Sequence, residues 1–508
     1  MADSIKRRDF LARTLQAGAL VGIGELAFLK GLEPVSPAQA RLPVNKVQFS
    51  PDIEPVVRLI EDTPRGKLLE AIASRIRQNL SYQEVLAALL LAGVRSIKPR
   101  PVGFKFHAVL VVNSAYLASL AAPDRDRWLP LFWALDNFKV SQALNQQEGG
   151  WVMMAVDEGK LPSPQQSKQR FIEAMDNWDE EGADRAITAL VRNAGASEII
   201  ELFWRYGARD FRDIGHKAIY AANSWRTLQS IGWRHAEPVM RSLAFALLEH
   251  EGANPARGHA EADRPWRENL ERATRIRAGW GRGRVDARDV TCFLDTLRNA
   301  SPGSACERVV ELLNKGVDPA SLWDGLFLQA GELIMRQPGI VGIHCVTSTN
   351  ALHYAYQVSG NDETRRLLLL QAAAFLPLFR KFMGLGKLRD NQRIDTLEKL
   401  DVTTPGAAGI AEIFADLSRD PLIAARKTLA VLESQANPQA ILTAARQLLF
   451  AKGTDAHDYK FSSAAFEDYY HTTSAWRNRY LATSMFNLRG SGDPDNDLVK
   501  RTRAALGA

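Results

Sequence analysis

The segment Gly215-His216-Lys217-Ala218-Ile219-Tyr220-Ala221-Ala222-Asn223-Ser224 decides the fold, because its pattern recurs along the chain. In this segment a histidine opens a helical stretch and an asparagine follows two turns later. Related stretches, with Asn or Ser at the second position, begin at His107, His344 and His457. The four copies are spaced by roughly a hundred residues, and such self-similarity indicates repeated helical units.

Repeated helical units stack on their apolar faces, and the stack is either an open superhelix or a closed ring. In both arrangements, equivalent residues of successive units lie on the same surface. We predict an all-α fold in which about four units form an α/α ring, with residues 41–508 as one large repeat domain. Ring closure would bring four histidines together near one end of the central cavity, namely His107, His216, His344 and His457.

Composition and periodicity support the all-α prediction. The 508 residues are 46% apolar and 24% charged, which is typical of a folded globular protein. Apolar residues recur at spacings of three and four, and no sustained alternating run suggests a strand. The clearest predicted helices cover residues 81–91, 186–190, 198–204, 238–248, 365–383 and 421–432.

Converging neutral imidazoles are a natural metal site, because an unprotonated ring nitrogen is a good ligand for iron, copper, zinc or manganese. The lack of thiolates near the four histidines favours redox-active iron or copper over structural zinc. We therefore predict that His107, His216, His344 and His457 ligate iron or copper. Carboxylates that flank the histidines are candidates to complete the ligand set: Asp213, Asp455, Asp458, Glu467 and Asp468.

The asparagines of the repeat are predicted to orient a bound ligand or substrate. At about 100° per residue, Asn223 lies about 20° from the direction of His216, whereas Asn350 lies about 120° from that of His344. Asn223 is therefore the better-aimed partner. Asn350 needs an irregular first helical turn to join it.

Two of the histidine segments, Gly215–Ser224 and Gly342-Ile343-His344-Cys345-Val346-Thr347-Ser348-Thr349-Asn350-Ala351-Leu352, resemble the histidine-headed helices of questin-oxidase-like proteins. The resemblance covers about residues 102–378. That family is all-helical, and its named member performs an oxygen-dependent ring opening. The resemblance implies an oxidoreductase and does not extend to the substrate.

Other enzyme classes lack their motifs in this chain. There is no GxGxxG after a strand, no HExxH, no GxSxG and no P-loop. Two alternatives to the oxidoreductase remain open: an α/α-ring polysaccharide lyase or glycosidase acting on a glycan, and a non-catalytic helical scaffold or metal or haem carrier. The net charge of +6 is small and its arginines are mostly scattered, so no nucleic-acid partner is expected.

The three cysteines, Cys292, Cys306 and Cys345, form no CxxC or CxxCH motif. Their spacing argues against a c-type haem, a cysteine-rich zinc site and an iron–sulfur cluster. One disulfide is compatible with the sequence, and Cys292 with Cys306 is the nearer pair.

Residues 1–40 are predicted to be an export signal rather than part of the fold. Arg7-Arg8 precedes Phe10-Leu11, an apolar run follows, and Ala38-Gln39-Ala40 is a small-residue cleavage site. The pattern resembles a twin-arginine signal peptide, which implies the twin-arginine translocase as a partner and a periplasmic or secreted protein. No later segment is apolar for long enough to span a bilayer, so no membrane span is expected in the mature form.

Replacing Arg7 and Arg8 together with lysine should leave uncleaved precursor inside the cell, because the twin-arginine pathway depends on the arginine pair. Cell fractionation with immunoblotting measures the distribution. Replacement of Lys6 by arginine is the matched control and should leave export unchanged. Normal export of the Arg7→Lys/Arg8→Lys variant would show that the pair is not the signal.

Overall fold

The computed structural model describes residues 45–384, 387–389, 391–434 and 437–507. The protein is 71% helical, and no strand forms in the described part of the chain, so the all-α prediction is confirmed. Among the described residues, no helix combines the length and the apolar character that crossing a membrane requires. The predicted export signal at residues 1–40 lies outside the described residues.

Contacts divide the chain into two units, Met1–Lys46 and Val47–Ala508, and every element below belongs to the second unit. The predicted helices are present with small changes of bounds. The longest one runs over Asp362–Met383, with Asn361 as its N-cap and Gly384 at its C-terminal end. Helix α4 has a capping box, since Ser81 accepts from the backbone of Glu84 and the Glu84 side chain accepts in return.

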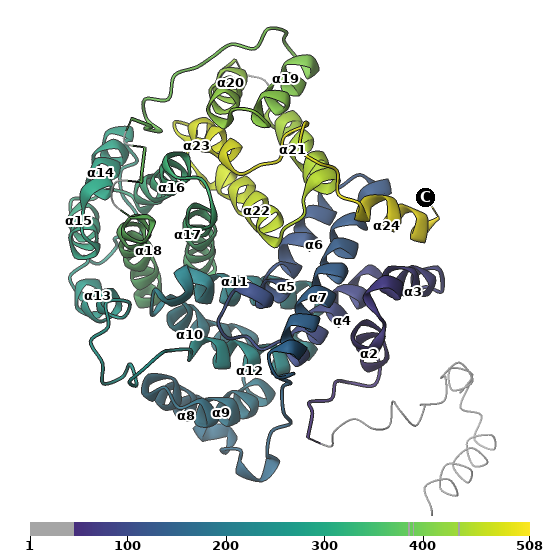
Figure 1. Cartoon of the computed structure of the whole chain (residues 1–508). Coiled ribbons are helices and arrows are strands. Elements are labelled where there is room, and N and C mark those ends of the chain that lie inside the picture. The colour runs from purple at the N-terminus through teal and green to yellow at the C-terminus, as the bar shows by residue number, and fades with distance from the viewer. Residues whose placement is uncertain (1–44, 385–386, 390, 435–436, 508) are drawn as a thin grey trace, which may run out of the picture. The chain divides into compact units, whose positions relative to one another are not determined.

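Four inner helices position the site, and the first of them is interrupted at Val111 (Figure 1). Each packs against the next along the chain, and the last packs against the first. All four run in the same direction, because residues near their starts meet one another and so do residues further along. The inner helices are α5 (His107–Leu110) with α6 (Val112–Leu120), α11 (His216–Ile231), α17 (Ile340–Val358) and α22 (Ala456–His471).

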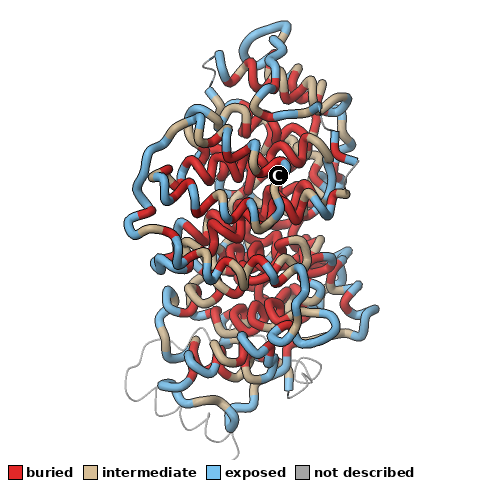
Figure 2. The backbone as a smooth tube through the Cα atoms, turned by 90° about the vertical axis from the view of Figure 1, so that its left-hand side faces the viewer, coloured by how far each residue is buried: buried red, intermediate tan, exposed pale blue. Residues whose placement is uncertain are grey.

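The other helices surround these four. Helix α7 covers α6, α10 and α12 cover α11, α16 and α18 cover α17, and α21 and α23 cover α22. Buried residues follow the sides of helices that face their neighbours, and exposed residues gather in the connections (Figure 2). The packing is established for these helices, whereas the wider arrangement as a ring of four equivalent units stays a prediction.

The bounds of the covering helices follow the chain. In the first half they are α2 (Glu54–Asp62), α3 (Arg65–Arg77), α4 (Tyr82–Ser96), α7 (Leu129–Gln147), α8 (Pro164–Asn177), α9 (Glu180–Asn193), α10 (Ala196–Ala208) and α12 (Ala236–Leu247). In the second half they are α13 (Arg264–Thr274), α14 (Ala287–Asn299), α15 (Pro302–Asn314), α16 (Pro319–Arg336), α18 (Asp362–Met383), α19 (Ala407–Leu417), α20 (Pro421–Glu433), α21 (Pro438–Lys452), α23 (Arg477–Thr483) and α24 (Leu498–Leu506).

All three cysteines are free thiols. Cys306 is buried and its Sγ donates to the carbonyl of Leu370, whereas Cys292 is exposed and accepts from Arg308. The disulfide that the sequence allows between Cys292 and Cys306 is therefore not formed.

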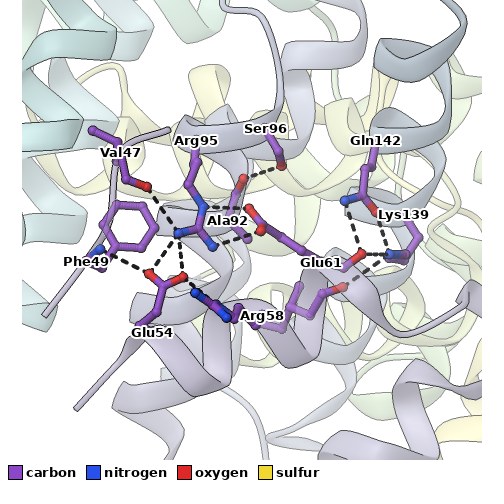
Figure 3. A network of polar contacts seen from close by, with 11 residues as sticks. Val47, Phe49, Glu54, Arg58, Glu61, Ala92, Arg95, Ser96, Lys139 and Gln142 are labelled. Atoms are coloured by element: carbon purple, nitrogen blue, oxygen red, sulfur yellow. Dashed lines mark hydrogen bonds and ion pairs between the residues drawn. The ribbon is translucent and has the colours of Figure 1, made fainter. Parts of the chain in front are cut away.

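A buried ion-pair network joins α2 to α4 at the start of the second unit (Figure 3). The guanidinium of Arg95 is fully buried and donates to both oxygens of Glu61, at 2.9 and 2.8 Å, and to both oxygens of Glu54, at 2.8 Å. It also donates to the carbonyl of Val47 at 3.4 Å. Pairing with two carboxylates compensates the burial of the cation, and the network holds the residues before α2 against the helical body.

Replacement of Arg95 by methionine should lower the free energy of unfolding by about 3–5 kcal/mol, because it leaves the Glu61 carboxylate buried without its cation. Chemical denaturation monitored by circular dichroism measures the change. The double variant Arg95→Met/Glu61→Leu is the control, and it should lose less than the sum of the two single variants. Strict additivity would show that the two side chains do not depend on each other.

Candidate metal centre

The four predicted histidines meet at the N-terminal ends of the inner helices. His107 and His216 are the first residues of α5 and α11, His457 is the second residue of α22, and His344 lies in the second turn of α17. Ring centres are 4.9 Å apart for His107 and His216, and 4.2 Å apart for His216 and His344. The His457 ring lies 5.0 Å from that of His344 and 4.3 Å from that of His107. We call these four residues the histidine cluster.

Hydrogen bonds to main-chain oxygens orient two of the rings. Nδ1 of His216 lies 2.5 Å from the carbonyl oxygen of Asp213, and Nδ1 of His344 lies 2.6 Å from that of Ile340. A carbonyl only accepts, so both δ nitrogens carry the proton and donate. The ε nitrogens of the two rings are buried and have no hydrogen-bond partner among the described residues. Each ε nitrogen therefore presents an unused lone pair.

A carboxylate orients the third ring. Nδ1 of His457 donates to Oδ1 of Asp455 at 2.6 Å, which leaves its ε nitrogen as the acceptor. That nitrogen lies 2.7 Å from Nε2 of His107. Fixing of one ring nitrogen by an acceptor, with the other free, is the usual arrangement around metal-binding histidines.

The nitrogens are close to the spacing that a metal ion needs. The ligand atoms of His107, His216 and His344 all lie within 4.8 Å of one another. A metal–nitrogen bond of about 2.1 Å separates two ligand nitrogens by at most about 4.2 Å. The trio would move inward by a few tenths of an ångström to hold an ion, and His457 adjoins it as a fourth ligand. The donor set therefore fits a metal ion.

The environment keeps the four imidazoles neutral. Burial lowers the pKa of His107 and His216 well below the ordinary value, and the nearby Lys460 cation adds to the effect. Burial also lowers the pKa of His344, and it lowers the pKa of His457 although Asp455 opposes it. A neutral imidazole offers the lone pair that a metal requires.

The turn before His216 has an unusual backbone that sets the ring in place. Asp213 and Ile214 have φ angles of 53° and 47°, and Gly215 follows at 81°. These left-handed conformations are costly for residues with a side chain and persist where the surrounding structure enforces them. A Cβ at Gly215 would lie 2.6 Å from that of Ser348 on α17, so only glycine fits between the turn and α17.

The predicted carboxylate ligands do not join the close group of ligand atoms among the described residues. Asp455 bonds to a histidine δ nitrogen, and Asp213 contributes its main-chain oxygen instead of its carboxylate. The remaining three are held elsewhere: Asp458 by Arg489, Glu467 by Arg226, and Asp468 by Asn350 and Tyr480. Proximity to a histidine in the sequence was therefore a poor guide to ligation.

The two predicted asparagines lie deeper along the inner helices and bond to other groups. Nδ2 of Asn223 donates to the carbonyl of Leu110 at 2.9 Å, and Nδ2 of Asn350 donates to Glu467 and Asp468 at 2.8 and 2.7 Å. The side-chain oxygens of both accept from Arg226. Helix α17 begins at Ile340, so no irregular turn redirects Asn350, and its amide faces α22.

Lys460 is the main site residue that the sequence interpretation missed. It lies on α22 and is fully buried, and its Nζ is 3.5 Å from Nε2 of His107. Burial lowers its pKa to about 7, against a small opposing effect of Asp455. The signal was in the repeat itself, since the residues three positions after the other histidines are the uncharged Leu110, Ile219 and Thr347.

A small cavity lies along the axis of the inner helices, beginning one turn beyond the histidine cluster. Its volume is about 10 Å³, room for about one water molecule. Lys460 lines it on the side of the cluster, and the polar residues Asn113, Thr347 and Ser463 lie around it. The predicted residues Asn223 and Asn350 line the same cavity together with Arg226 and Glu467.

Comparison of the chain with models of known protein families, with curated proteins and with solved structures finds no match in any of the three.

Replacement of Gly215 by alanine should lower the free energy of unfolding by about 2–4 kcal/mol, because the added Cβ combines a positive φ with an overlap against Ser348. Thermal and urea denaturation measure the loss. Gly252→Ala is the matched control, since Gly252 has a φ of 74° but no atom within 4 Å of an added Cβ. Equal losses in the two variants would mean that the contact with α17 imposes no constraint.

Proposed function

We propose that the histidine cluster binds one iron or copper ion and that the protein is a metal-dependent oxidoreductase acting on a small molecule. The observation that carries the proposal is the pair of buried ε nitrogens on His216 and His344, which have no partner among the described residues while their δ nitrogens are fixed. An unsatisfied buried acceptor is unfavourable unless something binds it. A metal ion would satisfy both nitrogens at once.

The chemistry of the ligands favours a redox metal. Four neutral imidazoles without a thiolate suit iron or copper, which the ion would use to exchange electrons with a substrate or oxygen. The residues of the chain hold the ion: His216 and His344 by preoriented rings, His107 and His457 from the neighbouring helices. Asp455 orients His457, and the asparagines with Arg226 form the polar floor beyond the cavity.

Two features of the sequence agree with this proposal. The histidine segments resemble those of questin-oxidase-like proteins, whose named member is an oxidase. The Arg7-Arg8 pattern resembles a twin-arginine signal, a route often used by proteins that acquire a cofactor before export. We extend the proposal to a periplasmic or secreted protein loaded with metal in the folded state.

A glycan-binding enzyme is the second candidate, and one surface hollow favours it. The hollow has a volume of about 970 Å³ and is lined by Trp225 and Trp266 together with the carboxylates of Asp176, Glu198 and Glu201. Aromatic faces beside carboxylates are the usual lining of a sugar cleft. Each of these carboxylates is already engaged, by Tyr206, Lys168 and Ser359 respectively, so the hollow ranks behind the histidine cluster.

Metal analysis of His216→Ala and His344→Ala tests the metal centre. Each variant should bind iron or copper at least about tenfold more weakly, with helix content unchanged by circular dichroism, because each removes one preoriented ligand. His259→Ala is the control, since His259 is exposed and lies outside the cluster. The metal should be quantified by mass spectrometry after dialysis against a chelator.

Full metal occupancy in both cluster variants would refute the assignment of these ligands. Equal binding by His259→Ala and loss of the metal in both cluster variants would support it. A bound ion that does not change oxidation state with reductant and oxygen would favour the carrier over the oxidoreductase.

A further inference from the structure

The strongest unexplained group near the histidine cluster is the side chain of Lys460. It is a fully buried amine, and no carboxylate lies within ion-pair distance of its Nζ among the described residues. A buried cation is normally paired, because the loss of hydration is otherwise uncompensated. The other fully buried lysine, Lys217, follows this rule, since its Nζ lies 3.0 Å from Asp210.

A second unsatisfied group faces the same space. Oδ1 of Asn113 is buried and has no hydrogen-bond partner in the described part of the chain, and Asn113 lines the axial cavity together with Lys460. Thr347 and Ser463 bring hydroxyl groups to the cavity wall. A space with room for about one water molecule, bordered by a free amine and a free amide oxygen, is a built site for a very small polar ligand.

Charge balance defines the class of that ligand. Four neutral imidazoles would bring a divalent or trivalent ion into the protein without a carboxylate in the ligand set. Asp455 supplies one negative charge through His457, whereas Lys460 stands 3.5 Å from a ligand nitrogen and has positive charge when protonated. The centre as a whole therefore carries excess positive charge, which an anion at the cavity would offset.

On this basis, and resting on the proposed metal function, we propose that the axial cavity binds a small anion of one or two heavy atoms, held between the metal and the amine of Lys460. Hydroxide and the reduced forms of dioxygen belong to this class. The amine donates a hydrogen bond to the anion whether or not it is protonated. The narrow cavity excludes larger anions on size.

Fluoride binding to the copper-loaded protein tests the inference, because fluoride is close to water in size and its nuclear spin splits the electron paramagnetic resonance signal of a copper ion that it contacts. Wild-type protein should show a saturable fluoride-dependent change, and iodide should produce none. The variant Lys460→Met should bind fluoride at least about tenfold more weakly. It should retain copper at equal or higher affinity, since a positive charge near the ion has been removed.

Two further variants separate a ligand site from a general structural effect. Ala464→Val places two methyl groups at the cavity wall and should abolish the fluoride effect without removing copper. Lys139→Met is the matched control, since Lys139 is also buried but bonds to the carbonyls of Ile60 and Glu61 in the α2 network. It should lose stability and keep the fluoride affinity of the wild type.

The outcomes for the two proposals are distinct. Copper binding without any fluoride effect, or with the same fluoride affinity in Lys460→Met and the wild type, would overturn the anion site and leave the metal centre intact. Failure of the wild type to bind iron or copper would overturn the metal centre and the anion site with it. Reduced copper affinity in Lys460→Met would assign Lys460 a structural role and also overturn the inference.

Discussion

The arrangement of the site depends on polar bonds buried between the inner helices. Arg226 of α11 pairs with Glu467 of α22 and donates to Asn350 of α17, and its guanidinium lies 3.9 Å from the ring centre of Tyr354. These bonds hold for one relative position of the three helices along their axes, because a shift by one turn would leave a buried ion unpaired. With that position set, the histidines two to three turns away are brought to one level.

The same constraint explains what could be predicted from the sequence. The repeat fixes which residues are equivalent, so the meeting of His107, His216, His344 and His457 followed from it. Helix angles also placed Asn223 toward the axis and Asn350 away from the direction of its histidine, as the structure has them. The all-α class followed from the spacing of apolar residues, which depends only on local geometry.

The rest depends on contacts between distant segments, which periodicity does not report. The carboxylates near the histidines were expected to be ligands, but Asp458 and Asp468 are engaged by Arg489 and Tyr480. Lys460 was overlooked because a lysine in a helix is usually solvated, and only the packing of four helices shows that it is buried. The turn at Asp213 and Ile214 was also unpredictable, since neither residue favours a positive φ.

The origin of the four histidines in distant segments has a consequence for the order of folding. His107 and His457 are 350 residues apart in the chain, yet their ε nitrogens are 2.7 Å apart. During synthesis from the N-terminus, helix α22 emerges after the other three inner helices are complete. The closing of the longest loop in the chain must therefore precede assembly of the full cluster, and contacts at such separation form slowly. Until then the cell contains a nearly finished protein with an incomplete cluster, and quality control before export would have to distinguish it from the finished one.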